Sequence, residues 1–100
     1  MFTDKNIETA DLESRTIGAL IRRRRGCHGL SQYQLAAQLA RLSGNNAIDR
    51  NRVARWERGG RVPDPYWRGW LSLALLVPKG RLDQAARVTY AQRDYEKVAY

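Results

Sequence analysis

Residues 49–63 read DRNRVARWERGGRVP and contain five arginines, one asparagine and one tryptophan. A guanidinium group is a planar fork that matches phosphate oxygens and the edge of guanine, and an asparagine amide matches the edge of adenine. Residues 17–63 hold ten arginines against Asp49 and Glu57, a formal charge of +8 that equals the net charge of the whole chain. This concentration of positive charge favours a polyanionic partner, DNA or RNA before an anionic membrane.

Residues 50–58 form two edges when they are placed on a helix at about 100° per residue. The outer edge spans about 140°. It consists of Arg50, Asn51, Ala54, Arg55 and Arg58. The inner edge consists of Val53, Trp56 and Glu57. A basic outer edge around a small alanine is typical of a helix that approaches bases closely in the major groove.

The elements that must position this helix are themselves predicted to be helices, because apolar residues recur at intervals of three and four and strand-like alternation is absent. A first helix is expected from Leu12 or Ser14 to Arg25, ending at the glycines of residues 26–29. Its inward residues are expected to be Ile17, Leu20 and Ile21.

Ser31 and Gln34 form a capping-box pattern, so a second helix should begin at Ser31. Residues 43–47, SGNNA, break this helix. Its buried face is expected to contain Leu35, Ala36, Leu39 and Leu42. Asp49 is placed to cap a third helix from Arg50 to Arg58, which Gly59 and Gly60 end.

Asp64 and Pro65 predict the start of a fourth helix, which Pro78 and Gly80 close. Its apolar side is expected to contain Trp67, Trp70, Leu71, Ala74 and Leu75. Residues 81–100 lack glycine and proline and predict one long amphipathic helix. Its apolar positions are Leu82, Ala85, Val88, Ala91, Tyr95 and Val98. The predicted fold is therefore an all-α compact bundle of about five helices.

Two segments together, LSQYQLAAQL and IDRNRVARWERGGRVP, resemble the helix-turn-helix of the lambda-repressor and Cro family, also called XRE-type. The resemblance covers roughly residues 17–76. It implies a DNA-binding domain at residues 14–78, preceded by an arm at 1–13 and followed by a C-terminal amphipathic helix at 79–100 that packs on the domain or dimerises. It also implies a sequence-specific regulator of transcription that reads double-stranded DNA in the major groove with helix 50–58.

The same resemblance implies roles for individual residues. Arg50, Asn51 and Arg55 match the positions that read bases. The positions that match contacts to the DNA backbone are Ser31, Gln32, Arg52, Arg58 and Arg61. Ala36 matches a position kept small where the second and third helices cross. Arg25 and Glu57 match a pair that forms a buried salt bridge in relatives, which makes Glu57 structural rather than catalytic.

One segment departs from the family pattern. Relatives connect the second and third helices by a tight turn, whereas ARLSGNNAI after Leu39 adds about seven residues here. We expect the second helix to extend through Leu42, with residues 43–47 as the loop. The angle between the two helices, and phosphate contacts by Arg41 or Asn45, depend on this loop.

Other classes of protein find little support in the sequence. Cys27 and His28 are the only residues of their types, so we expect no internal disulfide, no zinc site and no enzyme. No cofactor or small-molecule ligand is implied. The run Arg22–Arg25 resembles a targeting or RNA-binding patch, but four successive residues spread around a helix, which favours solvated or phosphate-facing roles. No apolar run is long enough for a membrane span and the N-terminus is too acidic for a signal peptide, so we expect a cytoplasmic protein.

Two functions remain open at this point. The first is the DNA-binding regulator, most simply as a homodimer, since one recognition helix covers only a few base pairs. The alternative is an antitoxin or adaptor-like module whose main role is to bind a protein partner through the C-terminal helix.

Overall fold

The computed structural model describes residues 15–98, with side chains through Asp94, and in that range it contains five helices and no strand. The helices are α2 (Ile17–Cys27), α3 (Gln32–Ser43), α4 (Arg50–Glu57), α5 (Pro65–Leu75) and α6 (Lys79–Val98). The predicted all-α class is confirmed for this part of the chain. The predicted arm at residues 1–13 lies outside it.

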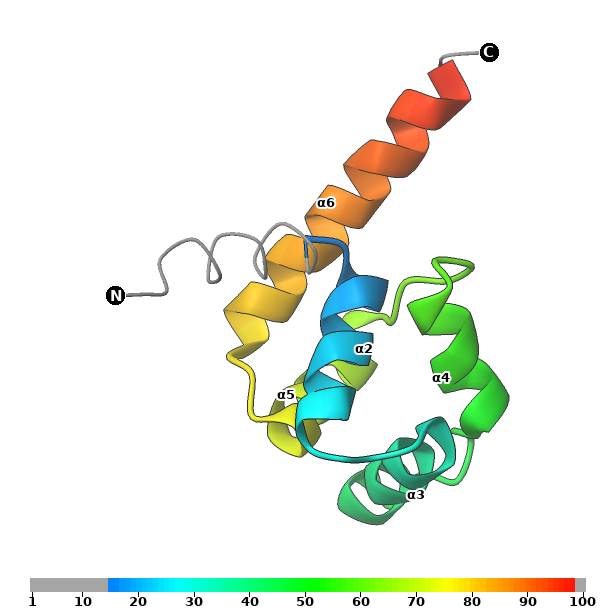
Figure 1. The fold of residues 1–100 in the computed structure, drawn as a ribbon, viewed down its shortest axis with the longest axis vertical. Coiled ribbons are helices and arrows are strands. Elements are labelled where there is room, and N and C mark those ends of the chain that lie inside the picture. The colour runs from blue at the N-terminus through cyan, green and yellow to red at the C-terminus, as the bar shows by residue number, and fades with distance from the viewer. Residues whose placement is uncertain (1–14, 99–100) are drawn as a thin grey trace.

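The helices surround a single core. α2 lies in the middle of the body, α4 flanks it on one side, α3 lies at one end, and α6 runs beside α2 before leaving the body (Figure 1). Most predicted inward residues are fully or almost fully buried, including Leu20, Leu39 and Leu71. Trp56 of α4 and Trp67 of α5 meet in this core with ring centroids 6.3 Å apart. The contact between these two tryptophans places the Trp56 side of α4 against the core.

Helix starts follow local capping chemistry. Ser31, Asp49 and Asp64 each precede a helix, and each side-chain oxygen accepts a hydrogen bond from the backbone N–H three residues further on. Ser31 completes the predicted capping box with Gln34. The first helix differs from the prediction. Thr16 has extended backbone and caps α2 itself, so α2 begins at Ile17 rather than at Leu12 or Ser14.

The end of α3 and the loop before α4 differ from the prediction in which residue is buried. α3 continues to Ser43 and ends at Gly44, whose φ of 70° lies in the left-handed region that glycine tolerates. Leu42 was expected to be buried but is 41% exposed, because the added last turn of α3 extends beyond the core. Ile48, in the following loop, is buried. The loop therefore has its own apolar anchor just before α4.

α2 and α4 cross with their backbones in contact. Gly18 is buried in α2, and a Cβ added to it would lie 2.5 Å from the carbonyl oxygen of Trp56 and 2.8 Å from that of Glu57. These distances are far below van der Waals contact, so only glycine permits this crossing. Gly18 therefore allows α4 to pack closely against α2.

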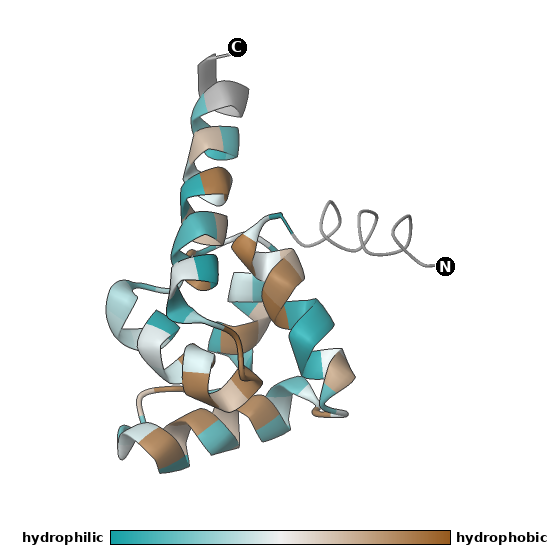
Figure 2. Ribbon diagram, turned by 90° about the vertical axis from the view of Figure 1, so that its left-hand side faces the viewer, coloured by the Kyte–Doolittle hydropathy of each residue, from teal (hydrophilic) through white to brown (hydrophobic). Residues whose placement is uncertain are grey.

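α6 belongs to the body in its first half only. Leu82, Ala85 and Thr89 are buried, whereas Ala91, which was expected on the same apolar stripe, is exposed because the helix has by then passed the end of the body. Figure 2 shows that the projecting part is mainly hydrophilic. Tyr95 and Val98 were also predicted on the apolar side of this helix, but their side chains lie outside the described part of the chain.

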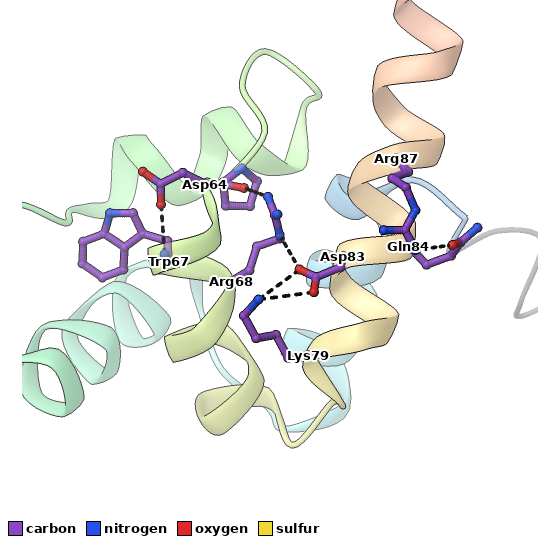
Figure 3. A network of polar contacts seen from close by, with 8 residues as sticks. Asp64, Trp67, Arg68, Lys79, Asp83, Gln84 and Arg87 are labelled. Atoms are coloured by element: carbon purple, nitrogen blue, oxygen red, sulfur yellow. Dashed lines mark hydrogen bonds and ion pairs between the residues drawn. The ribbon is translucent and has the colours of Figure 1, made fainter.

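Polar contacts fix α6 to its neighbours. Arg68 of α5 donates to a carboxylate oxygen of Asp83 at 2.7 Å, and Lys79 reaches the same carboxylate at 3.2 Å (Figure 3). The hydrogen bond from Arg68 is the main reason why the pKa of Asp83 is lowered. On α2, the backbone N–H of Ile17 donates to the buried Thr89 hydroxyl at 2.9 Å. The first half of α6 is thus packed against α2 and α5 as part of the domain.

Candidate nucleic-acid interface

α4 presents a row of polar side chains to solvent. Arg50, Asn51 and Arg55 are exposed, and their side chains make no hydrogen bond or ion pair with any other described residue. The opposite side of the helix is buried through Val53 and Trp56. We call the three exposed residues the α4 ridge. Its guanidinium and amide groups are available to an external ligand.

Ala54 was predicted on the exposed edge of this helix, and that prediction is wrong. Its exposed fraction is 6%. α4 packs against both α2 and α3, and Ala54 lines a hollow that is also bounded by Arg25 of α2 and Gln32 of α3. Ala54 therefore lies between neighbouring helices rather than on the outer edge of α4.

Two clefts lie along the α4 ridge. The first cleft, of about 430 Å³, lies between α4 and residues of α2 and the start of α3. The second cleft, of about 630 Å³, lies between α4 and residues 61–64, with Tyr90 of α6 also on its wall. Asn51 and Arg55 line both clefts, so this part of the ridge separates the two clefts.

The pair Arg25 and Glu57 joins α2 to the end of α4. The Arg25 guanidinium donates to both carboxylate oxygens of Glu57, at 2.7 and 3.0 Å, and to the carbonyl of Leu30 at 2.8 Å. The Glu57 side chain is 4% exposed and that of Arg25 is 18% exposed. The hydrogen bond from Arg25 to Glu57 is the main reason why the pKa of Arg25 is raised. A buried carboxylate is thereby satisfied.

Gln32 extends this contact to α3. Its side-chain N–H donates to a Glu57 carboxylate oxygen at 3.0 Å, which ties the first residue of α3 to the last residue of α4. Gln32 also lines the first cleft. The neighbouring Ser31 is exposed, and its hydroxyl oxygen accepts the capping hydrogen bond from Gln34. The start of α3 is therefore held in a fixed position beside the α4 ridge.

Three further arginines were predicted to contact the DNA backbone, and the structure separates them. Arg58 and Arg61 are exposed and have no partner among the described residues. Arg52 instead donates to the carbonyl of Ala47 at 3.0 Å and lies over the ring of Trp67, 5.5 Å from its centroid. Arg52 thus holds the loop before α4 against the core, and it is the least available of the three.

Tyr90 was not identified from the sequence as a neighbour of the ridge. It is half exposed on α6, and Arg93, one turn later, donates a hydrogen bond to the carbonyl of Gly59 after α4. No local pattern reports this proximity, because it depends on how α6 packs across the body. The C-terminal helix therefore reaches the wall of the second cleft.

Cys27 and His28 line neither of these clefts. Cys27 is exposed, and His28 lies 2.9 Å from the carbonyl oxygen of Leu75 at the end of α5. Among residues 15–98, no three His, Cys, Asp or Glu side chains gather where a metal ion could be held. In the same range, no helix has both the length and the apolar character to cross a membrane.

Comparisons with protein-family models, curated proteins and solved structures give no match for this chain.

Proposed function

We propose that this chain is a sequence-specific regulator of transcription that binds double-stranded DNA by placing α4 in the major groove, in the manner of the lambda-repressor and Cro family. The observation that carries the proposal is the α4 ridge. Arg50, Asn51 and Arg55 are exposed, unpaired among the described residues and carried on a helix whose other side is buried. Arginine and asparagine are the residues that pair bidentately with guanine and adenine there.

The dimensions of α4 suit this role. Its eight residues span about 12 Å, and a helix of ordinary width fits the major groove. We place the two sugar-phosphate backbones that border the groove at the two clefts beside the ridge. A helix so placed reads base edges, while residues around it fix its register by contacting phosphates.

Contacts to the DNA backbone are assigned to Ser31, Gln32, Arg58 and Arg61. Ser31 and Gln32 lie at the start of α3, where free backbone N–H groups and the helix dipole favour an anion. Arg58 and Arg61 follow α4 and are exposed. Arg52 is left out of this set, because its guanidinium is engaged with Ala47 and Trp67. The Gln32 side chain is likewise engaged with Glu57, so Gln32 is assigned a phosphate contact through its backbone N–H at the start of α3.

Arg55→Ala and Arg61→Ala test the division between base-reading and backbone residues. Arg55→Ala is expected to weaken binding to the cognate site by roughly 1 to 3 kcal/mol and to relax preference at one base pair. Arg61→Ala is expected to weaken binding to cognate and random duplexes alike and to flatten the salt dependence by about one unit of slope. Fluorescence anisotropy on both duplexes at several salt concentrations measures both quantities.

The comparison of the two variants carries its own control, since each removes one exposed arginine. If both variants lose the same affinity on cognate and random DNA, the base-reading role of Arg55 is wrong. Preserved melting curves for both proteins establish that the differences arise at the DNA surface.

The antitoxin or adaptor-like alternative is supported by one observation, the part of α6 that projects beyond the body (Figures 1 and 2). The projecting turns offer a surface to a second copy of the chain or to another protein. We favour a homodimer, because two α4 helices related by two-fold symmetry would read a palindromic site. Light scattering on the full chain distinguishes the dimer that we expect from a monomer.

A further inference from the structure

The structure divides the run of four arginines at the end of α2 into four different environments. Arg25 pairs with Glu57, and Arg24 donates to the carbonyl of Leu75 at 3.4 Å. Arg23 is exposed, lines neither cleft and has no partner among the described residues. Arg22 is also exposed and unpaired in that range, but it lines the first cleft beside α4. Arg22 and Arg25 therefore both line the first cleft, but only the Arg22 side chain does so without a partner among the described residues.

The first cleft carries a large excess of positive charge. Arg22 from α2 shares it with three arginines of α4 and its C-terminal cap, Arg50, Arg55 and Arg58, all exposed and unpaired among the described residues. The cleft also contains one carboxylate, Glu57, which is already bound by Arg25. Four uncompensated guanidinium groups around one hollow repel one another and raise the local concentration of anions.

The groups around the cleft favour a phosphate rather than a base. Arg22 belongs to α2, which packs against α4 but is not the helix proposed to enter the groove. The backbone of a DNA strand runs beside an inserted recognition helix, and side chains next to that helix contact its phosphates. A guanidinium fork binds two oxygens of a phosphodiester at once. The buried Ala54 adds little bulk to the hollow.

We propose that Arg22 binds a phosphodiester of the DNA backbone in the first cleft and that α2 is thereby part of the DNA-binding surface. The proposal rests on the function proposed above and adds a residue to it. It also assigns different roles to the arginines of residues 22–25: Arg22 binds DNA, Arg24 and Arg25 contact other parts of the fold, and Arg23 is solvated.

The adjacent arginines provide the test. Arg22→Ala is expected to weaken binding to cognate and random duplexes about three- to tenfold and to lower the salt slope by about one. Arg23→Ala removes the same charge one residue away and is expected to stay within about twofold of the unsubstituted chain, since an exposed charge outside the cleft is screened by salt. Arg22→Lys retains the charge without the fork, so intermediate affinity is expected. Anisotropy titrations of the full chain measure all three.

The outcomes separate this inference from the function on which it rests. If the unsubstituted chain binds duplex DNA but Arg22→Ala and Arg23→Ala behave alike, only the role of Arg22 is overturned. A changed base preference for Arg22→Ala overturns the phosphate assignment in favour of a base contact. If the unsubstituted chain binds no duplex at all, both proposals fail. Arg22→Lys keeps the comparison informative if Arg22→Ala is destabilised.

Discussion

Replacing Gly18 by alanine is expected to lower the free energy of unfolding by at least about 3 kcal/mol, because overpacking at a rigid contact forces whole elements apart. The new Cβ would lie 2.5 Å from the Trp56 carbonyl oxygen and 2.8 Å from that of Glu57. Both atoms belong to helix backbone, so no side chain can rotate away. α4 must then shift off α2, which also strains the buried pair between Arg25 and Glu57. Denaturant unfolding followed by circular dichroism measures the loss.

Gly26→Ala is the matched control within the same helix. A Cβ at Gly26 meets nothing within 4 Å, and the residue lies in ordinary helical backbone. Alanine is favoured over glycine in a helix by roughly 0.5 to 1 kcal/mol, so Gly26→Ala is expected to stabilise the domain by about that amount. If Gly18→Ala is as stable as Gly26→Ala, α2 and α4 do not cross in the way described.

Glu57→Ala is expected to destabilise the domain by roughly 3 to 5 kcal/mol, because it leaves the Arg25 guanidinium largely buried without its counter-charge. Arg25 would keep only its hydrogen bond to the Leu30 carbonyl, and Gln32 would lose its acceptor as well. The start of α3 and the end of α4 would then be untied from each other. A fall of well over about 10 °C in Tm is expected for a domain of this size.

Two further variants show whether the charge or the contact matters. Glu57→Gln retains an oxygen that can accept from Arg25 but removes the charge, so a smaller loss than for Glu57→Ala is expected. The double replacement Arg25→Met with Glu57→Leu leaves no buried charge and is expected to recover much of the lost stability. The base preference of the folded Glu57→Ala protein should be unchanged. An unaltered melting curve for Glu57→Ala would remove this pair from the account.

The starts of α3, α4 and α5 could be predicted from the sequence because their causes are local, whereas the cap of α2 at Thr16 was missed. The capping residues Ser31, Asp49 and Asp64 act within four residues of chain, and their patterns are visible without the fold. The inner face of α4 was also predictable, because Val53 and Trp56 follow from helical periodicity alone.

Features that depend on how helices meet could not be predicted in the same way. Gly18 resembles any other glycine in the sequence until α4 is placed against it. The same holds for Ala54, which lies between helices rather than toward solvent. Arg52 carries the same charge as the neighbouring arginines. Only the folded structure shows that its guanidinium contacts the Ala47 carbonyl and the Trp67 ring.

The sequence predicts the residues that α4 contributes to the candidate site, but not the residues that other helices contribute. The ridge residues Arg50, Asn51 and Arg55 were identified by residue type and helical spacing, and the structure leaves them exposed. Arg22 and Tyr90 come from α2 and α6, which reach the clefts only through tertiary packing. Periodicity within one helix carries no information about a cleft shared by two.

The most direct test of the central claim is selection of binding sites from random duplex DNA by the full chain, followed by affinity measurements on the enriched sequence at several salt concentrations. The account predicts a defined consensus, with two-fold symmetry if α6 mediates a dimer, bound far more tightly than random duplex. Substitution of Arg50, Asn51 or Arg55 should alter that consensus. Recovery of no consensus, with weak and steeply salt-dependent binding to every sequence, would contradict the claim that α4 reads DNA.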